Sequence, residues 1–119
     1  MKVFIVTGEI NHGKTRYLRE LYELLIEKNI KTGGFTSNGI INKEGLKDFE
    51  ICNLSDNKSM HLASRNQYPG YIKMNESFYF NPAAIEFGNN ILEDTLKNNS
   101  SVVIIDEIGP IELNGRVWY

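Results

Sequence analysis

The sequence predicts an α/β fold, with a mostly parallel central sheet flanked by helices and an antiparallel β-meander inserted into it. Two short apolar runs, at residues 2–6 and 101–105, are typical of strands buried on both faces of a parallel sheet. An amphipathic helical pattern follows the first run, and another precedes the second. The order strand, helix, meander, helix, strand indicates one layered α/β core.

The first strand, residues 2–6, ends at Thr7 and Gly8, and a helix is predicted from residue 15 to about residue 29. Its apolar positions recur at i, i+3, i+4 and i+7, which places them on one face. These positions are Leu18, Leu21, Tyr22 and Leu25.

The meander is predicted as three strands, at residues 34–42, 46–54 and 59–64. The first turn contains Gly45, which suits a positive φ, and the second turn spans residues 55–58. In the second strand, apolar residues alternate with Asp48 and Glu50. We therefore expect both carboxylates to lie on a wet face of that strand.

A second helix is predicted from its start signals, with Asn81 as the N-cap and Pro82 at the first helical position. It ends near residue 98, and the segment before it, residues 66–80, is expected to be irregular or extended with a turn at residues 69–70. The predicted buried stripe of the helix is Ala84, Gly88, Ile91, Leu92 and Leu96.

The composition limits the class of protein. A chain of 119 residues has the size of one domain, so residues 1–119 are expected to form a single domain. The net charge of −2 gives no overall attraction to nucleic acid or to a membrane, and we expect neither as a partner. The single cysteine, Cys52, excludes an intrachain disulfide. No apolar run approaches the ~20 residues that span a bilayer, so a cytoplasmic location is expected.

A phosphate-binding motif follows the first strand directly. Residues 8–15, GEINHGKT, match G-x-x-x-x-G-K-[ST], in which a glycine-rich backbone wraps phosphate oxygens and the lysine reaches the β- and γ-phosphates. The helix that begins near Gly13 adds its positive end. We expect nucleotide contacts from Gly8, Glu9, Ile10, Asn11, His12, Gly13, Lys14, Thr15 and Arg16.

The strand at residues 101–105 is followed by two carboxylates. An aspartate at the end of an apolar strand, in a chain with a phosphate loop, is typical of an Mg²⁺ site, so Asp106 and the hydroxyl of Thr15 are predicted to hold Mg²⁺. Glu107 is predicted to polarise a water toward the γ-phosphate, and Lys14 to act on the same phosphate during catalysis. The alternative for Glu107 is a solvated loop carboxylate.

For three further residues the sequence gives weaker indications of a functional role. His12 lies inside the phosphate loop, where a solvated histidine is the simpler interpretation. His61 is expected on a wet strand face. Arg65 can approach the phosphates as a charge-stabilising group, with a surface arginine as an equal alternative.

Four segments resemble the small P-loop nucleoside-triphosphatase family, which includes the cancer-related nucleoside-triphosphatase and its prokaryotic relatives. They are TGEINHGKT at the start of the chain, GGF at 33–35, LASR at 62–65 and DEIGPIEL at 106–113. The resemblance implies a nucleotide-kinase-like P-loop fold and Mg²⁺-dependent hydrolysis of ATP, GTP and other nucleoside triphosphates with broad base specificity. It implies the same roles for the phosphate loop, for Asp106 and for Glu107.

The chain departs from this family in two places. Residue 16 is Arg16 where the family often has a second threonine, a change outside the phosphate contacts. Family members continue beyond the point that corresponds to Tyr119, with further strands and helices. We therefore expect an incomplete P-loop domain with an uncovered sheet edge that self-associates.

Two other functions stay open at this point. A nucleotide or nucleoside kinase would use the same loop, but it needs an arginine-rich lid, and beyond Arg16 the chain has only Arg19, Arg65 and Arg116. A nucleotide-binding protein without turnover would keep the loop and lose hydrolysis. Phosphate release measured with and without candidate acceptors separates these functions.

Overall fold

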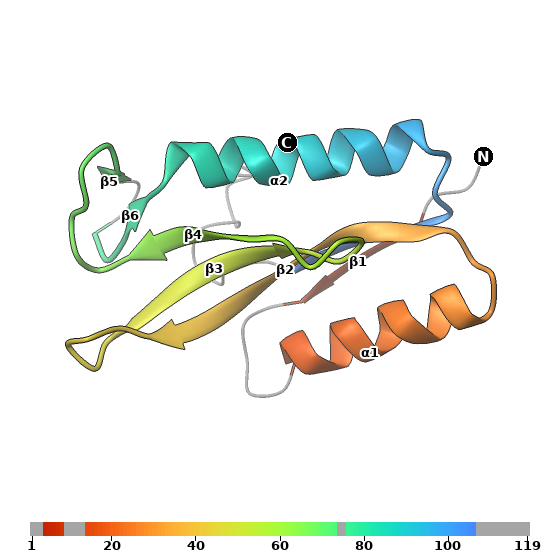
Figure 1. The fold of residues 1–119 in the computed structure, drawn as a ribbon, viewed down its shortest axis with the longest axis horizontal. Helices are drawn as coiled ribbons and strands as arrows, with labels where there is room; N and C mark the ends of the chain where they lie inside the picture. Colours follow the sequence, from red (N-terminus) through yellow and green to blue (C-terminus); the bar gives the residue numbers. More distant parts are fainter. Residues whose placement is uncertain (1–3, 9–13, 74–75, 107–119) are drawn as a thin grey trace.

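The computed structural model describes residues 4–8, 14–73 and 76–106, which form an α/β fold with one sheet between two helices (Figure 1). The predicted order of strand, helix, meander, helix and strand is confirmed. The helices are α1 (Lys14–Glu27) and α2 (Pro82–Lys97). The strands are β1 (Phe4–Gly8), β2 (Thr32–Ile41), β3 (Lys47–Asn53), β4 (Ser59–Ser64), β5 (Ile72–Lys73), β6 (Tyr79–Phe80) and β7 (Val102–Asp106).

The described strands form one sheet in the order β1-β7-β2-β3-β4-β6-β5. β7 lies between β1 and β2 and is parallel to both, and the remaining pairs are antiparallel. The α/β class is confirmed. The sequence predicted a mostly parallel sheet, whereas most strand pairs of the observed sheet are antiparallel. The reason is the length of β2, which pairs with β7 over Thr32 to Phe35 and then continues beside β3. The meander is therefore a direct extension of the central sheet.

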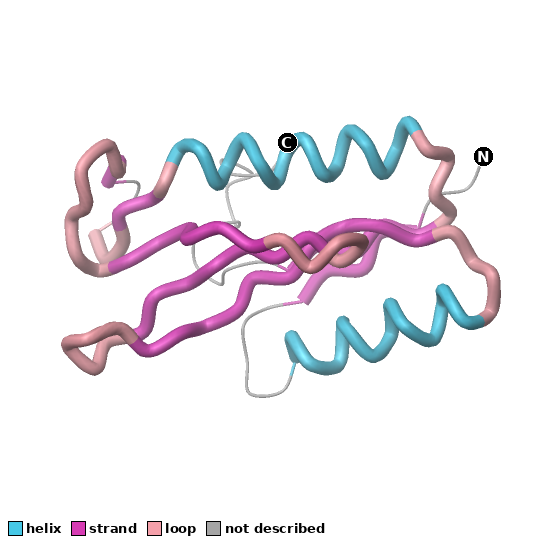
Figure 2. The backbone as a smooth tube through the Cα atoms, in the orientation of Figure 1, coloured by secondary structure: helices cyan, strands magenta, loops and turns pink. Residues whose placement is uncertain are grey.

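Each face of the sheet is covered by one helix (Figure 2). The larger apolar cluster lies under α2 and includes Phe35, Ile51 and Val103. The smaller cluster lies under α1 and includes Leu18 and Ile104. Neighbouring residues of β7 thus point to opposite faces, with the period of two expected of a strand that is buried on both sides.

The predicted helix faces are largely confirmed. In α1, Leu18 is buried, and the other predicted positions, Leu21, Tyr22 and Leu25, are half-buried. At the start of α2, the side chain of Asn81 accepts a hydrogen bond from the Ala83 N–H over 3.1 Å, as expected of an N-cap. The two helices of the described residues are too short or too polar to cross a membrane.

The end of α2 corrects one prediction. Leu96 is 45% exposed, whereas Thr95 is buried. Successive helical residues turn by about 100°, so Thr95 continues the face of Gly88 and Ile91 and Leu96 turns away from it. At this point α2 lies close to β2. A Cβ added at Gly33 would be only 2.6 Å from the Oγ1 of Thr95.

The predicted meander strands are confirmed with small shifts of their ends, and the turn glycine Gly45 has a φ of 79°. The expected turn before β5 is also present, with Gly70 at a φ of 83°. Residues 66–80, expected to be irregular or extended, contain two short paired strands, β5 and β6. The two parallel strands at the ends of the chain extend further than predicted at their carboxyl ends, β1 to Gly8 and β7 to Asp106.

Candidate active site

The carboxyl ends of β1 and β7 lie side by side. In the parallel register of these strands, Gly8 is the partner of Asp106. Gly8 is the first residue of the phosphate-binding motif, and Asp106 is the predicted metal ligand. The structure therefore brings the two motifs to one point at the carboxyl edge of the sheet, although they stand at opposite ends of the sequence. Open α/β sheets bind their ligands at this edge.

The phosphate-binding motif connects β1 to α1. The strand ends at Gly8 and the helix begins at Lys14, so the motif lies between the end of a strand and a helix N-terminus, which favours anions. Residues 9–13 lie outside the described residues, and for Lys14 and Thr15 only the helical backbone is described. Arg16 is exposed, and its Nε donates to Oε1 of Glu20 over 3.2 Å on the surface of α1.

Asp106 is fully buried, and Ser37 on β2 binds it twice. The Ser37 N–H donates to Oδ2 of Asp106 over 3.0 Å, and the Ser37 hydroxyl donates to the Asp106 backbone carbonyl over 2.9 Å. The first bond holds the carboxyl group and the second holds the backbone of Asp106 against β2, the strand beside β7. Sequence reasoning missed Ser37, although three consecutive polar residues, 36–38, inside a strand were a usable signal.

The donor set of this edge fits Mg²⁺. This ion prefers oxygen ligands and is usually held by one or two carboxylates together with substrate phosphates and water. Asp106 supplies one buried carboxylate beside the loop, and Thr15 lies in the first turn of α1. Among the described residues, no three His, Cys, Asp or Glu side chains are grouped to hold a metal without a substrate. Glu107, the predicted water activator, lies outside the described residues.

Two of the weaker candidates, Arg65 and His61, lie on or just after β4 and not at the ends of β1 and β7. Arg65 is exposed after β4, with its guanidinium carbon 5.3 Å from the centre of the Phe78 ring, so the surface interpretation fits its position. His12 lies outside the described residues. His61 belongs to a separate group of polar residues centred on β3 and β4.

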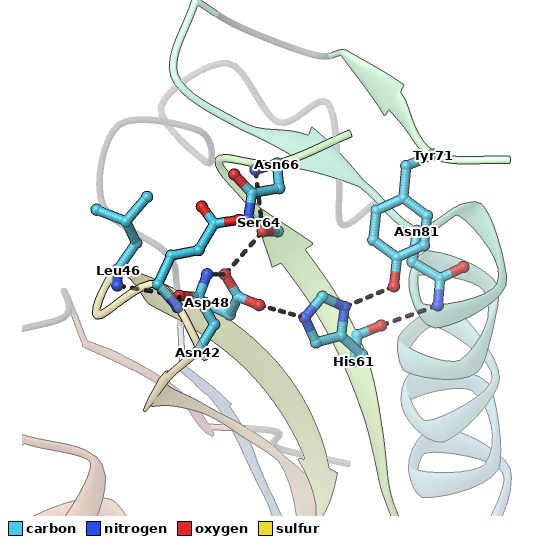
Figure 3. Close-up of polar contacts among 9 residues, drawn as sticks. Asn42, Leu46, Asp48, His61, Ser64, Asn66, Tyr71 and Asn81 are labelled. Atoms are coloured by element: carbon cyan, nitrogen blue, oxygen red, sulfur yellow. Dashed lines mark hydrogen bonds and ion pairs between the residues drawn. The ribbon is translucent and has the colours of Figure 1, made fainter. Parts of the chain in front are cut away.

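This group, which we call the Asp48 cluster, consists of Asp48, Asn42, His61, Ser64 and Tyr71 (Figure 3). The carboxylate of Asp48 accepts hydrogen bonds from the Ser64 hydroxyl over 2.7 Å, His61 Nε2 over 2.9 Å and the Asn42 amide over 3.0 Å. Asp48 is only 2% exposed, so the wet face predicted for this residue is wrong. Burial is tolerated because three donors, two on β4 and one just after β2, satisfy the carboxylate.

The hydrogen bonds also set the charge of Asp48 and the direction of its contact with His61. Burial alone would raise the pKa of the Asp48 carboxyl, but the hydrogen bonds from His61, Ser64 and Asn42 outweigh it and hold that pKa below its usual 3.8. Because an ionised carboxylate only accepts, Nε2 of His61 carries a proton, and Nδ1 faces the Tyr71 hydroxyl. Burial raises the pKa of the Tyr71 hydroxyl, which therefore stays protonated.

We expect Asp48 to make stability depend on pH in the acid range. Its folded-state pKa lies below the unfolded value of 3.8, so its contribution is complete above that value and is lost as the pH falls through 3.8 toward the folded-state pKa. Asp48→Asn should melt below the wild type at about pH 6, and the gap between their melting temperatures should narrow as the pH falls below 3.8. Thermal melts across this pH range check the expectation, and Glu93→Gln, at an exposed position of α2, serves as the control. A gap in melting temperature that does not change with pH would contradict it.

Comparisons with known proteins agree with one another: each finds similarity to nucleoside-triphosphatases. A family model described as NTPase matches residues 3–117. The curated protein "Nucleoside-triphosphatase THEP1" of Saccharolobus solfataricus is 35% identical over 115 residues, which cover 95% of this chain and 62% of the relative. The protein of the same name from Sulfolobus acidocaldarius is 27% identical over 115 residues, which cover 92% of this chain and 61% of the relative. The chain therefore spans about three fifths of the length of these relatives.

One solved structure matches the fold. The "Solution Structure of a Human Cancer-Related Nucleoside Triphosphatase" superposes with a TM-score of 0.60 and covers 97% of this chain and 82% of that chain. The sequence identity is 14%, so this likeness concerns the fold. It agrees with the P-loop arrangement deduced from the register of β1 and β7.

Proposed function

The chain belongs to the NTPase family whose model it matches over residues 3–117, and from this premise we propose that it hydrolyses nucleoside triphosphates to diphosphate and phosphate. The observation that carries the proposal is the pairing of Gly8 with Asp106, with α1 beginning at Lys14. It supports a site in which the phosphate loop and the acidic end of β7 face one substrate. The names of the two curated relatives support the same activity.

In this proposal, the loop from Gly8 to Arg16 binds the triphosphate, and Lys14 stabilises charge on the γ-phosphate. Mg²⁺, held by Asp106 and Thr15, would neutralise phosphate charge when bound. Glu107 accepts a proton from the attacking water. The water oxygen forms a bond to the γ-phosphorus, the bond from that phosphorus to the bridging oxygen breaks, and the diphosphate leaves with the electron pair.

We also propose broad base specificity, with ATP and GTP among the substrates, because every residue assigned to the substrate acts on its phosphates. The test is a phosphate-release assay with a panel of nucleoside triphosphates, with and without Mg²⁺ and candidate acceptors. Comparable, Mg²⁺-dependent release from several triphosphates without an acceptor is expected. Release that requires an acceptor would instead indicate a kinase, and binding without release would indicate a nucleotide-binding protein.

Lys14→Ala is expected to weaken binding of the Mg²⁺-nucleoside triphosphate by about 1.5–3 kcal/mol, the contribution of a hydrogen bond to a charged group. The loss arises because the lysine is the cationic contact of the phosphate loop. Calorimetric titration with a non-hydrolysable analogue measures it. Lys28→Ala, just after α1, is a matched control for the loss of one positive charge. Equal affinities of the wild type and Lys14→Ala would remove the phosphate loop from the proposal.

A further inference from the structure

Two side chains of β2 share a face of the sheet with Asp106. Side chains alternate along a strand, and Phe35 belongs to the cluster under α2, so Thr36 and Asn38 point to the opposite face. On β7, Ile104 belongs to the cluster under α1, and Asp106 follows it by two residues on the same face. Asp106, Thr36 and Asn38 therefore all lie on the face of the sheet that is turned toward α1.

The register places these side chains at the carboxyl edge. The last parallel pair of β2 and β7 is Phe35 with Ile105, so one residue further along each strand Thr36 stands alongside Asp106. β2 then continues past the end of β7 to Ile41, which carries Asn38 beyond the edge. Asp106 thus lies between the phosphate-loop strand β1 on one side and the polar stretch of β2 on the other.

Both side chains have a buried oxygen for which the described part of the chain provides no hydrogen-bond partner. Thr36 is fully buried, and its Oγ1 has no hydrogen-bond partner among the residues that the structure describes. The same holds for Oδ1 of Asn38, on a residue that is half-buried. Buried polar side-chain atoms are nearly always hydrogen-bonded, so such atoms at a ligand-binding edge indicate a missing polar ligand.

We propose that Thr36 and Asn38 bind the water that attacks the γ-phosphate, and this inference rests on the proposed function. In-line attack requires the water on the side of the γ-phosphorus opposite the bridging oxygen. Because β2 lies across Asp106 from β1, the strand that leads into the phosphate-binding motif, we place this water on the side of β2. A hydroxyl and an amide each accept and donate but carry no charge, so they orient the water and leave its proton to the base.

The energetics of Thr36 separate this role from a structural one. A valine of nearly the same shape would fill the same space without leaving a buried hydroxyl unsatisfied. In the protein without nucleotide, Thr36→Val is therefore expected to raise the melting temperature. A hydroxyl that served only the fold would show the opposite sign. Thr32 on the same strand provides the comparison, since it is also buried but its hydroxyl donates to the Ile30 carbonyl over 2.9 Å.

The experiment measures kcat, KM and melting temperature for wild type, Thr36→Val, Asn38→Leu and Thr32→Val in the full chain. We expect kcat to fall on the order of 10²-fold in the first two variants, as for a reactant displaced by about 1 Å, with KM nearly unchanged. Affinity for a non-hydrolysable triphosphate should also be unchanged. Thr32→Val should keep the wild-type kcat and melt at a lower temperature.

The outcomes separate this inference from the function on which it rests. Wild-type kcat in both Thr36→Val and Asn38→Leu would overturn the inference and leave the proposed hydrolysis intact. A lower melting temperature for Thr36→Val would overturn the premise that its hydroxyl lacks a partner. A wild-type chain that releases no phosphate would overturn the proposed function and this inference with it.

Discussion

Gly34→Ala is expected to prevent the chain from folding. Gly34 has a φ of 128°, which side chains rarely adopt, and a Cβ added there would lie 1.9 Å from the backbone oxygen of Ile104. The contact is with the backbone of β7, which no rotamer change can relieve. The two strands would have to separate, and β2 would then lose its pairing with β7 and the bonds from Ser37 to Asp106.

The loss should be most of the ~5–15 kcal/mol that stabilises a domain of this kind. Far-ultraviolet circular dichroism and denaturant titration measure it. Gly45→Ala is the matched control, because Gly45 also has a positive φ of 79° but no atom lies within 4 Å of the added Cβ. It should cost only the left-handed backbone strain of roughly 1–2 kcal/mol. A cooperative melt of Gly34→Ala at the wild-type temperature would contradict the expected clash.

Glu107→Gln is expected to lower hydrolysis by about 10²–10⁴-fold while nucleotide binding is kept. The amide has nearly the same shape as the carboxylate but cannot accept the proton of the attacking water. Single-turnover phosphate release gives the rate, and titration with a non-hydrolysable analogue gives the affinity. Glu112→Gln is the matched comparison in the same segment. Wild-type turnover by Glu107→Gln would show that the base is another group, with Glu112 as the next candidate.

Asp106→Asn is expected to give a different signature from Glu107→Gln. Removing the charge of the proposed metal ligand should raise the Mg²⁺ concentration needed for half-maximal hydrolysis, because a neutral amide is a weaker ligand for this ion. An Mg²⁺ titration of the rate at saturating nucleotide measures the shift. An unchanged Mg²⁺ requirement would contradict the assignment of Asp106 to the metal.

The regular elements could be predicted from the sequence because their signals are local. The spacing of Leu18, Leu21 and Leu25 predicts α1, and Asn81 before Pro82 predicts the start of α2. The phosphate-binding motif is equally local, because its glycines, lysine and hydroxyl are contiguous in the chain. Each of these patterns depends on the geometry of a single turn, strand or loop, which neighbours in the sequence determine.

The sequence by itself therefore determined the α/β class, the order of the elements and the two motifs of the candidate site. Only the tertiary structure decided the strand order that brings Gly8 beside Asp106, the hydrogen bonds from Ser37 to Asp106, 69 residues away, and the burial of Asp48. A local pattern cannot show whether an acidic residue on a strand faces water or donors, because those donors come from distant segments. His61 and Ser64 reach Asp48 only after β4 pairs with β3, and that pairing, with the hydrogen bonds it allows, makes the buried carboxylate stable.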